Sequence, residues 1–184
     1  MDVIRQTTPL QVGDSPEALR AAVQALHDQA AIRDLVAMYA VARDDHDLES
    51  VLDCYAPDGT FMHGTTPVTG HAALREYYLA NMRRNAFSLH IPHSHVVSLE
   101  SPAEGSGLVT GHGEFAHPDT LVMCAYRYTD RYVKLDGRWV FASRGHDFVY
   151  ALPVGEMAGV GRDLLRLRWP HRPPAEAEWR PRPV

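Results

Sequence analysis

The sequence contains only two cysteines in 184 residues, Cys54 and Cys124. Two cysteines are too few for a disulfide framework, and their spacing matches no zinc-binding motif. The sequence also lacks the run of about 18 apolar residues that spans a bilayer, and residues 1–14 lack the basic and apolar stretches of a signal peptide. These absences predict a cytoplasmic protein without a membrane partner.

An excess of positive charge is also missing. Eighteen basic and 23 acidic residues give a net charge of −5 and a pI of about 6.1, so we expect no nucleic-acid partner. A composition of 45% apolar and 22% charged residues is typical of a soluble globular protein, and the length fits one domain. Histidine, in contrast, is abundant: six of the 11 fall between His90 and His146.

The first half of the chain carries helix signals. Residues 14–16 supply an N-cap and a first-turn proline, so we expect a helix to begin near Pro16. Apolar residues recur at helical spacing over residues 28–43, which predicts an amphipathic helix with one buried face. Asp47 can cap the next helix, which should stop at residues 56–59, and residues 70–84 have the composition of a further helix.

The second half of the chain changes to strand-like alternation. After a short strand at residues 60–63, four longer strands are predicted at residues 90–100, 107–117, 120–134 and 138–150. Asp136-Gly137 suits a type I′ turn and predicts a hairpin. In the strand before it, Val122, Cys124, Tyr126, Tyr128 and Tyr132 should share one packed face, opposite Arg127 and Arg131.

Helices followed by an antiparallel sheet predict an α+β fold. We expect a cone-shaped α+β barrel, in which three helices on the N-terminal side pack in a curved, mainly antiparallel sheet. This domain would cover residues 15–155, after an N-terminal lead-in at residues 1–14. Residues 156–184 form an Arg/Pro-rich tail that should pack on a neighbouring subunit or stay mobile.

Asp44 and a histidine cluster are the strongest candidates for chemistry. Asp44 lies where the helix over residues 28–43 ends, and His90, His93 and His95 open a predicted strand. An aspartate beside a histidine fixes the tautomer of the imidazole and raises its basicity, and histidine is the usual proton carrier near neutral pH. The pattern therefore predicts an Asp–His acid/base site.

The order of several short motifs resembles one family. These motifs are Tyr39-x4-Asp44-x2-Asp47-Leu48, Ala56-Pro57-Asp58-Gly59, the histidines at 93–95, and Tyr126-Arg127-Tyr128-x-Asp130-Arg131-Tyr132 before Gly137-Arg138-Trp139. Over about residues 28–150 the chain resembles the SnoaL-like, scytalone-dehydratase-like family of the nuclear-transport-factor-2-like superfamily. The resemblance implies a dehydratase, dehydrohalogenase, isomerase or polyketide cyclase that needs no cofactor and forms a homo-oligomer, a trimer or a dimer. Some members of the superfamily only bind, so the fold does not decide the function.

The resemblance also implies catalytic residues. Asp44 matches the catalytic aspartate of the family, and Tyr39 matches a tyrosine that lines the site in bile-acid-dehydratase-like members. The catalytic histidine of the family opens the first long strand, where His95 fits the scytalone-dehydratase pattern and His93 fits the other. Both histidines would share one face of a regular strand. We favour His95 and keep His93 as the alternative.

Further residues would bind the substrate. His112 or His117 stands in for the second histidine of scytalone dehydratase, although their spacing places them on opposite strand faces unless a bulge intervenes. His63 falls near one site tyrosine of that enzyme and Arg43 replaces another, which argues against scytalone as the substrate. Arg144 is a candidate anchor for an anionic or carbonyl group, unless it is a solvated arginine.

A metal site is the main competing interpretation of the histidines. His93, His95 and Glu100 match part of the first cupin motif, whose side chains bind a transition metal. The second cupin motif is missing, and cupins lack three leading helices, so we expect neither a metal nor another cofactor.

Our hypothesis from the sequence is a cofactor-independent lyase of the dehydratase type, in which the Asp–His pair acts on a cyclic hydroxy-ketone-like small molecule. The same groups would serve an isomerase or a polyketide cyclase, since all three reactions pass through an enolate-like species. A non-catalytic module that binds small molecules is the alternative from another class.

Overall fold

The computed structural model describes residues 12–159 and 163–179. Most of the predicted lead-in therefore lies outside the described residues. The elements in chain order are α1 (Pro16–Asp44), α2 (Leu48–Asp53), β1 (Tyr55–His63), β2 (Thr66–Thr69), α3 (His71–Met82), β3 (Ser88–Leu99), β4 (Glu104–His117), β5 (Thr120–Leu135), β6 (Arg138–Pro153) and the 3₁₀ helix η2 (Val154–Gly159).

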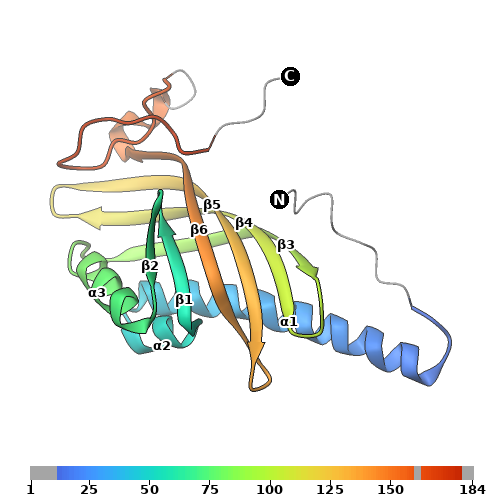
Figure 1. Cartoon of the computed structure of the whole chain (residues 1–184). Coiled ribbons are helices and arrows are strands. Elements are labelled where there is room, and N and C mark those ends of the chain that lie inside the picture. The colour runs from blue at the N-terminus through green and yellow to red at the C-terminus, as the bar shows by residue number, and fades with distance from the viewer. Residues whose placement is uncertain (1–11, 160–162, 180–184) are drawn as a thin grey trace.

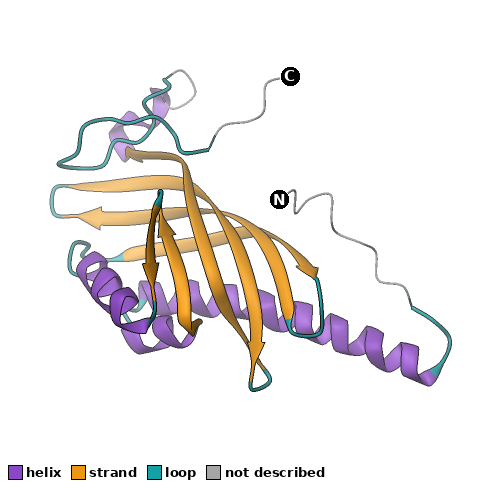
Figure 2. Cartoon of the chain, viewed as in Figure 1, coloured by secondary structure: helices purple, strands orange, loops and turns teal. Residues whose placement is uncertain are grey.

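One six-stranded sheet, in the order β2-β1-β6-β5-β4-β3, curves around the helices (Figures 1 and 2). Neighbouring strands are antiparallel except β1 and β6, which are parallel. The helices cover one face of the sheet, with α1 packed mainly against β3; α1 and α2 precede the strands, and α3 lies between β2 and β3 in the chain. The predicted α+β fold, with helices packed in a curved, mainly antiparallel sheet, is confirmed. Among the described residues, no helix combines the length and apolar character that a membrane crossing requires.

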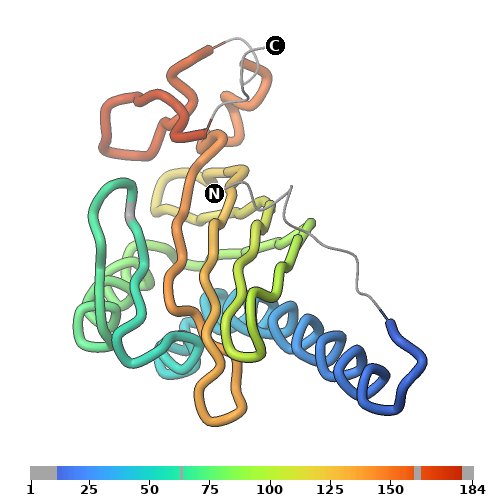
Figure 3. Tube along the Cα trace, turned by 45° about the vertical axis from the view of Figure 1, so that its right-hand side comes forward, coloured from blue at the N-terminus to red at the C-terminus, as the bar shows by residue number. Residues whose placement is uncertain are grey.

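The first helix is longer than the amphipathic segment alone predicted. Ser15 caps α1 by accepting a hydrogen bond from the Ala18 N–H, and Pro16 occupies the first turn as expected. From there one continuous helix of 29 residues runs to Asp44. Its N-terminal part extends past the sheet (Figures 1 and 3), and only its second half buries a continuous face. This half delivers Tyr39, Arg43 and Asp44 to the interior.

The inner face of the sheet is built by tyrosines facing glycines. The predicted inward face of β5 is confirmed, because Tyr126, Tyr128 and Tyr132 are each at most 3% exposed. On the neighbouring strand β4, a Cβ atom at Gly107 would lie 2.5 Å from the Tyr132 hydroxyl oxygen, and one at Gly111 would lie 2.5 Å from the Tyr126 hydroxyl oxygen. Glycine at these positions leaves the space that the phenol groups occupy.

Strand β3 contains a β-bulge that the sequence pattern did not predict. The pairing of β3 with β4 shifts between Pro92 and Ser94, so one extra residue, His93, is inserted there. As a result His93 and His95 lie on opposite faces of the sheet, and the expectation that they share a face was wrong.

Two turns test the local sequence signals. Asp136 and Gly137 have φ angles of 48° and 81°, and they connect β5 to β6 as the hairpin prediction required. Residues 56–59, where the second helix was predicted to stop, instead belong to β1, and an irregularity there interrupts the pairing with β6. Strand β2 was not predicted; it forms a hairpin with β1 around Gly64, whose φ angle is 58°.

The C-terminal segment 163–179 folds back onto its own chain (Figure 3). Ala151 accepts a hydrogen bond from the Arg168 N–H and donates one to Arg166, while the Glu178 N–H donates to Phe148. These hydrogen bonds hold the segment on its own chain, which argues against a mobile tail; packing on a neighbouring subunit stays a prediction. As predicted, the segment forms no regular helix or strand. The part of β6 after His146 is not paired with β1, so its edge is free, and the segment bonds to this edge at Ala151. The domain boundary at residue 155 stays a prediction.

Candidate functional site

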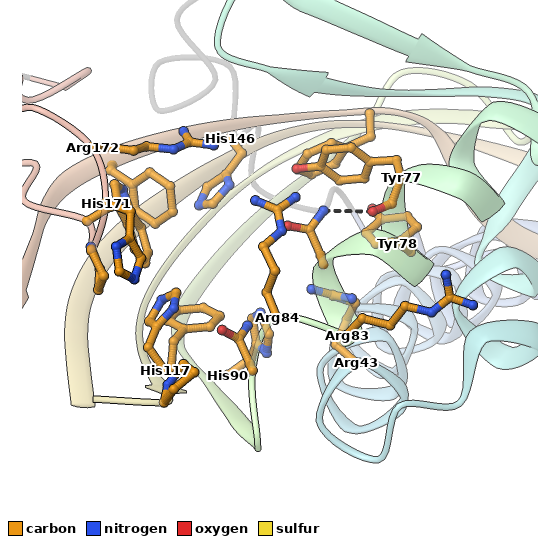
Figure 4. A pocket seen from close by; sticks show the side chains of 18 of the residues that line it. Arg43, Tyr77, Tyr78, Arg83, Arg84, His90, His117, His146, His171 and Arg172 are labelled. Atoms are coloured by element: carbon orange, nitrogen blue, oxygen red, sulfur yellow. Dashed lines mark hydrogen bonds between the residues drawn. The ribbon is translucent and has the colours of Figure 1, made fainter. Parts of the chain in front are cut away.

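A pocket with a volume of about 530 Å³ opens between the inner face of the sheet, α3 and the C-terminal segment (Figure 4). Aromatic rings make up much of its wall: Tyr39, Phe61, Tyr77, Tyr78, Phe115, Tyr128, Phe148 and Trp169. Basic side chains and histidines complete it: Arg43, Arg83, Arg84, Arg172, His90, His117, His146 and His171. Among the described residues, no aspartate or glutamate lines it.

Asp44 and His90 form a hydrogen-bonded pair at the wall of this pocket, which His90 lines. The His90 Nδ1–H donates to Asp44 Oδ1 at 2.6 Å, and the His90 backbone N–H donates to Asp44 Oδ2 at 2.8 Å. The Ser88 hydroxyl donates to Oδ1 at 3.2 Å. Both side chains are largely buried, with 17% of Asp44 and 6% of His90 exposed. Because Asp44 holds Nδ1–H, the lone pair of His90 is on Nε2, which has no hydrogen-bond partner among the described residues.

The charge state of His90 results from two opposing effects. Burial lowers the pKa of His90 below its ordinary value of 6.5, and the Arg43 guanidinium acts in the same direction. The hydrogen bond and charge of Asp44 raise this pKa and partly offset the burial. At neutral pH His90 is therefore an uncharged imidazole, the form that can accept a proton.

Tyr39 lies in a chain of phenol hydroxyls. Its hydroxyl oxygen is 3.1 Å from that of Tyr78, which is 2.6 Å from that of Tyr55. Burial raises the pKa of Tyr55 and Tyr78 well above the ordinary value, so both phenols stay protonated at neutral pH. Protonated hydroxyls at the pocket wall can donate hydrogen bonds to an oxygen atom of a ligand.

The two histidines favoured by the sequence lie away from Asp44. His93 is on the outer face of the sheet, where its Nε2 is 2.6 Å from Nδ1 of His112. His95 is on the inner face, but its Nε2 donates to the Tyr132 hydroxyl oxygen at 2.9 Å and it does not line the pocket. Burial lowers the pKa of His95 to about 4. The structure pairs Asp44 with His90, not with either of these residues.

Arg144 belongs to the core. It is fully buried and forms two hydrogen bonds to Asp130, from Nε at 2.9 Å and from Nη2 at 2.7 Å. Its guanidinium lies 3.9 Å from the ring centre of Phe141 and 4.4 Å from that of Tyr39. These contacts place Arg144 behind the wall of the pocket, where it supports Tyr39.

The remaining predicted binding residues divide between the two faces of β4. His117 lines the pocket and contacts the ring of Trp169, whereas His112 lies on the outer face near Tyr150. His112 and His117 are five residues apart, and this odd spacing predicted that they face opposite sides of the strand. His63 ends β1, and its side chain lies outside the described part of the structure.

Sequence reasoning placed His90 in the histidine cluster but did not select it, and it missed the C-terminal residues of the pocket. One signal for His90 was available, because Ser88 and His90 are two residues apart and both contact Asp44 from the same strand face. Trp169 and Arg172 gave no local signal, since their positions depend on how the C-terminal segment folds back.

The cupin-like metal site is not assembled. His93 and His95 lie on opposite faces, and Glu100 pairs with Arg131 at 2.8 Å. Within residues 12–159 and 163–179, no group of three or more metal-ligating side chains is close enough to hold an ion.

Comparison with known proteins gives a family match and several similar folds. Residues 24–145 match the model of the SnoaL-like domain. Hexachlorocyclohexane dehydrochlorinase LinA type 2 superposes with a TM-score of 0.67 at 17% identity, over 72% of this chain and 92% of that chain. A candidate scytalone dehydratase from Novosphingobium aromaticivorans has a TM-score of 0.67 at 17% identity, over 70% and 89% of the two chains. A candidate aromatic ring hydroxylase from the same species reaches 25% identity with a TM-score of 0.66, over 72% and 97%. These likenesses show a shared fold.

Proposed function

The chain belongs to the SnoaL-like domain family, and on this premise we propose that it is a lyase of the dehydratase type acting without a cofactor on a cyclic hydroxy-ketone-like small molecule. The observation that carries the proposal is the contact between Asp44 and His90 at the wall of an aromatic pocket. Dehydrochlorination by LinA and dehydration of scytalone, named for the similar structures, are both eliminations.

In the proposed reaction, Nε2 of His90 takes the proton next to the carbonyl group of the substrate. Asp44 stabilises the resulting imidazolium, and the Tyr39 hydroxyl donates a hydrogen bond to the carbonyl oxygen as enolate charge develops. The electron pair of the enolate then forms the carbon–carbon double bond and expels the hydroxyl group. The imidazolium returns its proton to that leaving group, so water departs and His90 is neutral again.

The proposed base is His90 and no longer His95. A base needs a lone pair without another hydrogen-bond partner, and Nε2 of His90, a residue that lines the pocket, has none among the described residues, which supports this choice. His95 uses its Nε2–H to donate to Tyr132, which leaves that nitrogen without a lone pair for catalysis.

An isomerase or a cyclase would use the same first step, because each also begins by removing a proton next to a carbonyl group. The buried carboxylate beside His90 favours an enzyme over a pure binding module. A buried acid contributes little to the binding of an apolar ligand, but it fixes the tautomer that a base requires.

The test measures the shared first step. A panel of cyclic ketones and β-hydroxyketones would be incubated with the protein in D₂O, and the exchange of α-protons and the formation of enone would be followed by NMR. We expect exchange to fall on the order of a hundredfold in His90→Gln and Asp44→Asn. His95→Gln, the matched control, should retain exchange. Full exchange by His90→Gln would refute the proposal, and exchange without enone would point to the isomerase.

A further inference from the structure

Arg43 is a buried cation without a counterion among the described residues. It is 7% exposed, and its Nε and Nη1 atoms are buried without a hydrogen-bond partner in this part of the chain. Its guanidinium lies 4.8 Å from the ring centre of Tyr78, in the wall of the pocket. Burying an unpaired charge is unfavourable, so this arrangement costs the free protein stability.

Arg144, the other buried arginine among the described residues, has an acidic partner, and so do two partly buried arginines. Arg144 pairs with Asp130, Arg131 with Glu100 and Arg75 with Glu49. The nearest acid in sequence to Arg43 is Asp44, whose two oxygens are already occupied by Ser88 and His90. Of the two buried arginines among the described residues, Arg43 is the one without a carboxylate partner, and it lines the pocket.

The charge of the rest of the pocket has the same sign. Arg83, Arg84 and Arg172 also line it, and none of them forms an ion pair with a carboxylate of the described residues. Figure 4 shows Arg84 reaching into the middle of the cavity. Positive side chains gather here although the chain as a whole has a net charge of −5. Arg83, Arg84 and Arg172 are exposed and Arg43 is buried, and a cleft lined by charges of one sign attracts ligands of the opposite sign.

We propose that the ligand of this pocket is an organic anion, with a carboxylate or similar oxyanion group that binds the guanidinium of Arg43. Planar guanidinium and carboxylate groups form charge-assisted hydrogen bonds with matched geometry. Phe115, Phe148 and Trp169 would contact the apolar body of the same molecule. This inference rests on the proposed function for the reaction, and it narrows the substrate to a cyclic hydroxy ketone that also bears an acid group.

The experiment compares two ligands that differ in charge and little in shape. Isothermal titration calorimetry at pH 7 would measure the binding of 2-naphthoate and of 2-naphthamide to the full chain. We expect 2-naphthoate to bind at least about tenfold more tightly, and Arg43→Met to remove most of this preference. Arg20→Met, which removes an exposed arginine of α1 outside the pocket, should keep it. Equal binding of the two ligands, no binding of 2-naphthoate at millimolar concentration, or an unchanged preference in Arg43→Met would overturn the proposal.

Thermal unfolding of the free protein is an independent readout. If Arg43 serves a ligand, removing its unpaired charge should raise the unfolding temperature of Arg43→Met above that of the wild type. A decrease would identify Arg43 as a structural residue and count against the proposal. Arg43→Lys keeps the charge, so it should keep a preference for 2-naphthoate.

The anion-site proposal and the proton-transfer proposal can fail independently of each other. A loss of α-proton exchange in His90→Gln without a preference for the anion would leave the lyase proposal standing and refute the anion site. A preference for 2-naphthoate together with full exchange in His90→Gln would do the reverse.

Discussion

His95 provides a direct test of the roles assigned to the two inner-face histidines of β3. Its imidazole donates from Nε2 to Tyr132, whose hydroxyl donates to Asp130 at 2.9 Å. Burial lowers its pKa to about 4, whereas in the unfolded chain it titrates near the ordinary value of 6.5. The unfolded chain therefore binds a proton more readily than the folded protein, and acid should destabilise the fold through His95.

The size of this effect follows from the two pKa values. The stabilisation is fully present above pH 6.5, and it is lost as the pH falls toward 4. Linkage between protonation and folding gives a loss of about 2 kcal/mol from pH 7 to pH 5 and about 3 kcal/mol by pH 4. Replacing His95 by glutamine keeps a donor for the Tyr132 oxygen and removes the titrating group.

Urea unfolding at pH 7 and pH 5 would measure the effect, with wild type and His95→Gln compared at each pH. We expect the two proteins to differ by less than about 1 kcal/mol at pH 7, and the variant to lose about 2 kcal/mol less than the wild type on acidification. His27→Gln, at an exposed position on α1, controls for the loss of an imidazole. Equal losses in wild type and His95→Gln would refute the buried, neutral state assigned to His95.

Three further predictions concern the pocket and the core behind it. In Asp44→Asn the pKa of His90 should fall further below 6.5, because the carboxylate that raises it is gone; an unchanged value in an NMR titration would contradict the pairing. Asp130→Asn leaves the charge of Arg144 buried and unpaired, so the free energy of unfolding should fall by about 3–5 kcal/mol, and a loss below about 1 kcal/mol in urea unfolding would argue against the pair. Trp169→Ala should weaken the binding of 2-naphthoate by about tenfold and lower the free energy of unfolding by about 1–2 kcal/mol. The reason is that the Trp169 ring, which belongs to the C-terminal segment, forms part of the pocket wall. Unchanged affinity would show that this segment does not cover the ligand.

Local signals in the sequence predicted most of the fold because each reports a local physical requirement. Ser15 and Pro16 mark the start of α1, Asp47 caps α2 through the Ser50 N–H, and the Asp136-Gly137 pair has the positive φ angles of its turn. Alternation along β5 predicted its buried face, because successive side chains of a strand point to opposite sides.

The candidate site was predicted less well, and a single inserted residue accounts for the error in the histidines. In a regular strand His93 and His95 would face one side and His90 the other. The bulge after Pro92 reverses the second half of the strand, which brings His95 to the same face as His90 and leaves His93 outside. A bulge depends on the pairing with β4, so the pattern of β3 alone does not reveal it.

The end of α1 explains how one short stretch of sequence can serve both proposed roles. Successive residues of a helix point about 100° apart, so Arg43 and Asp44 need not neutralise each other although they are neighbours in the chain. Asp44 reaches β3 and is fully engaged by Ser88 and His90, while Arg43 points toward Tyr78 of α3 and keeps an unpaired charge. If Asp44 paired with Arg43 instead, His90 would lose the partner that fixes its tautomer, and the pocket would lose its buried cation. The separation of these two charges is therefore what would let the same helix end orient a base and receive an anionic substrate.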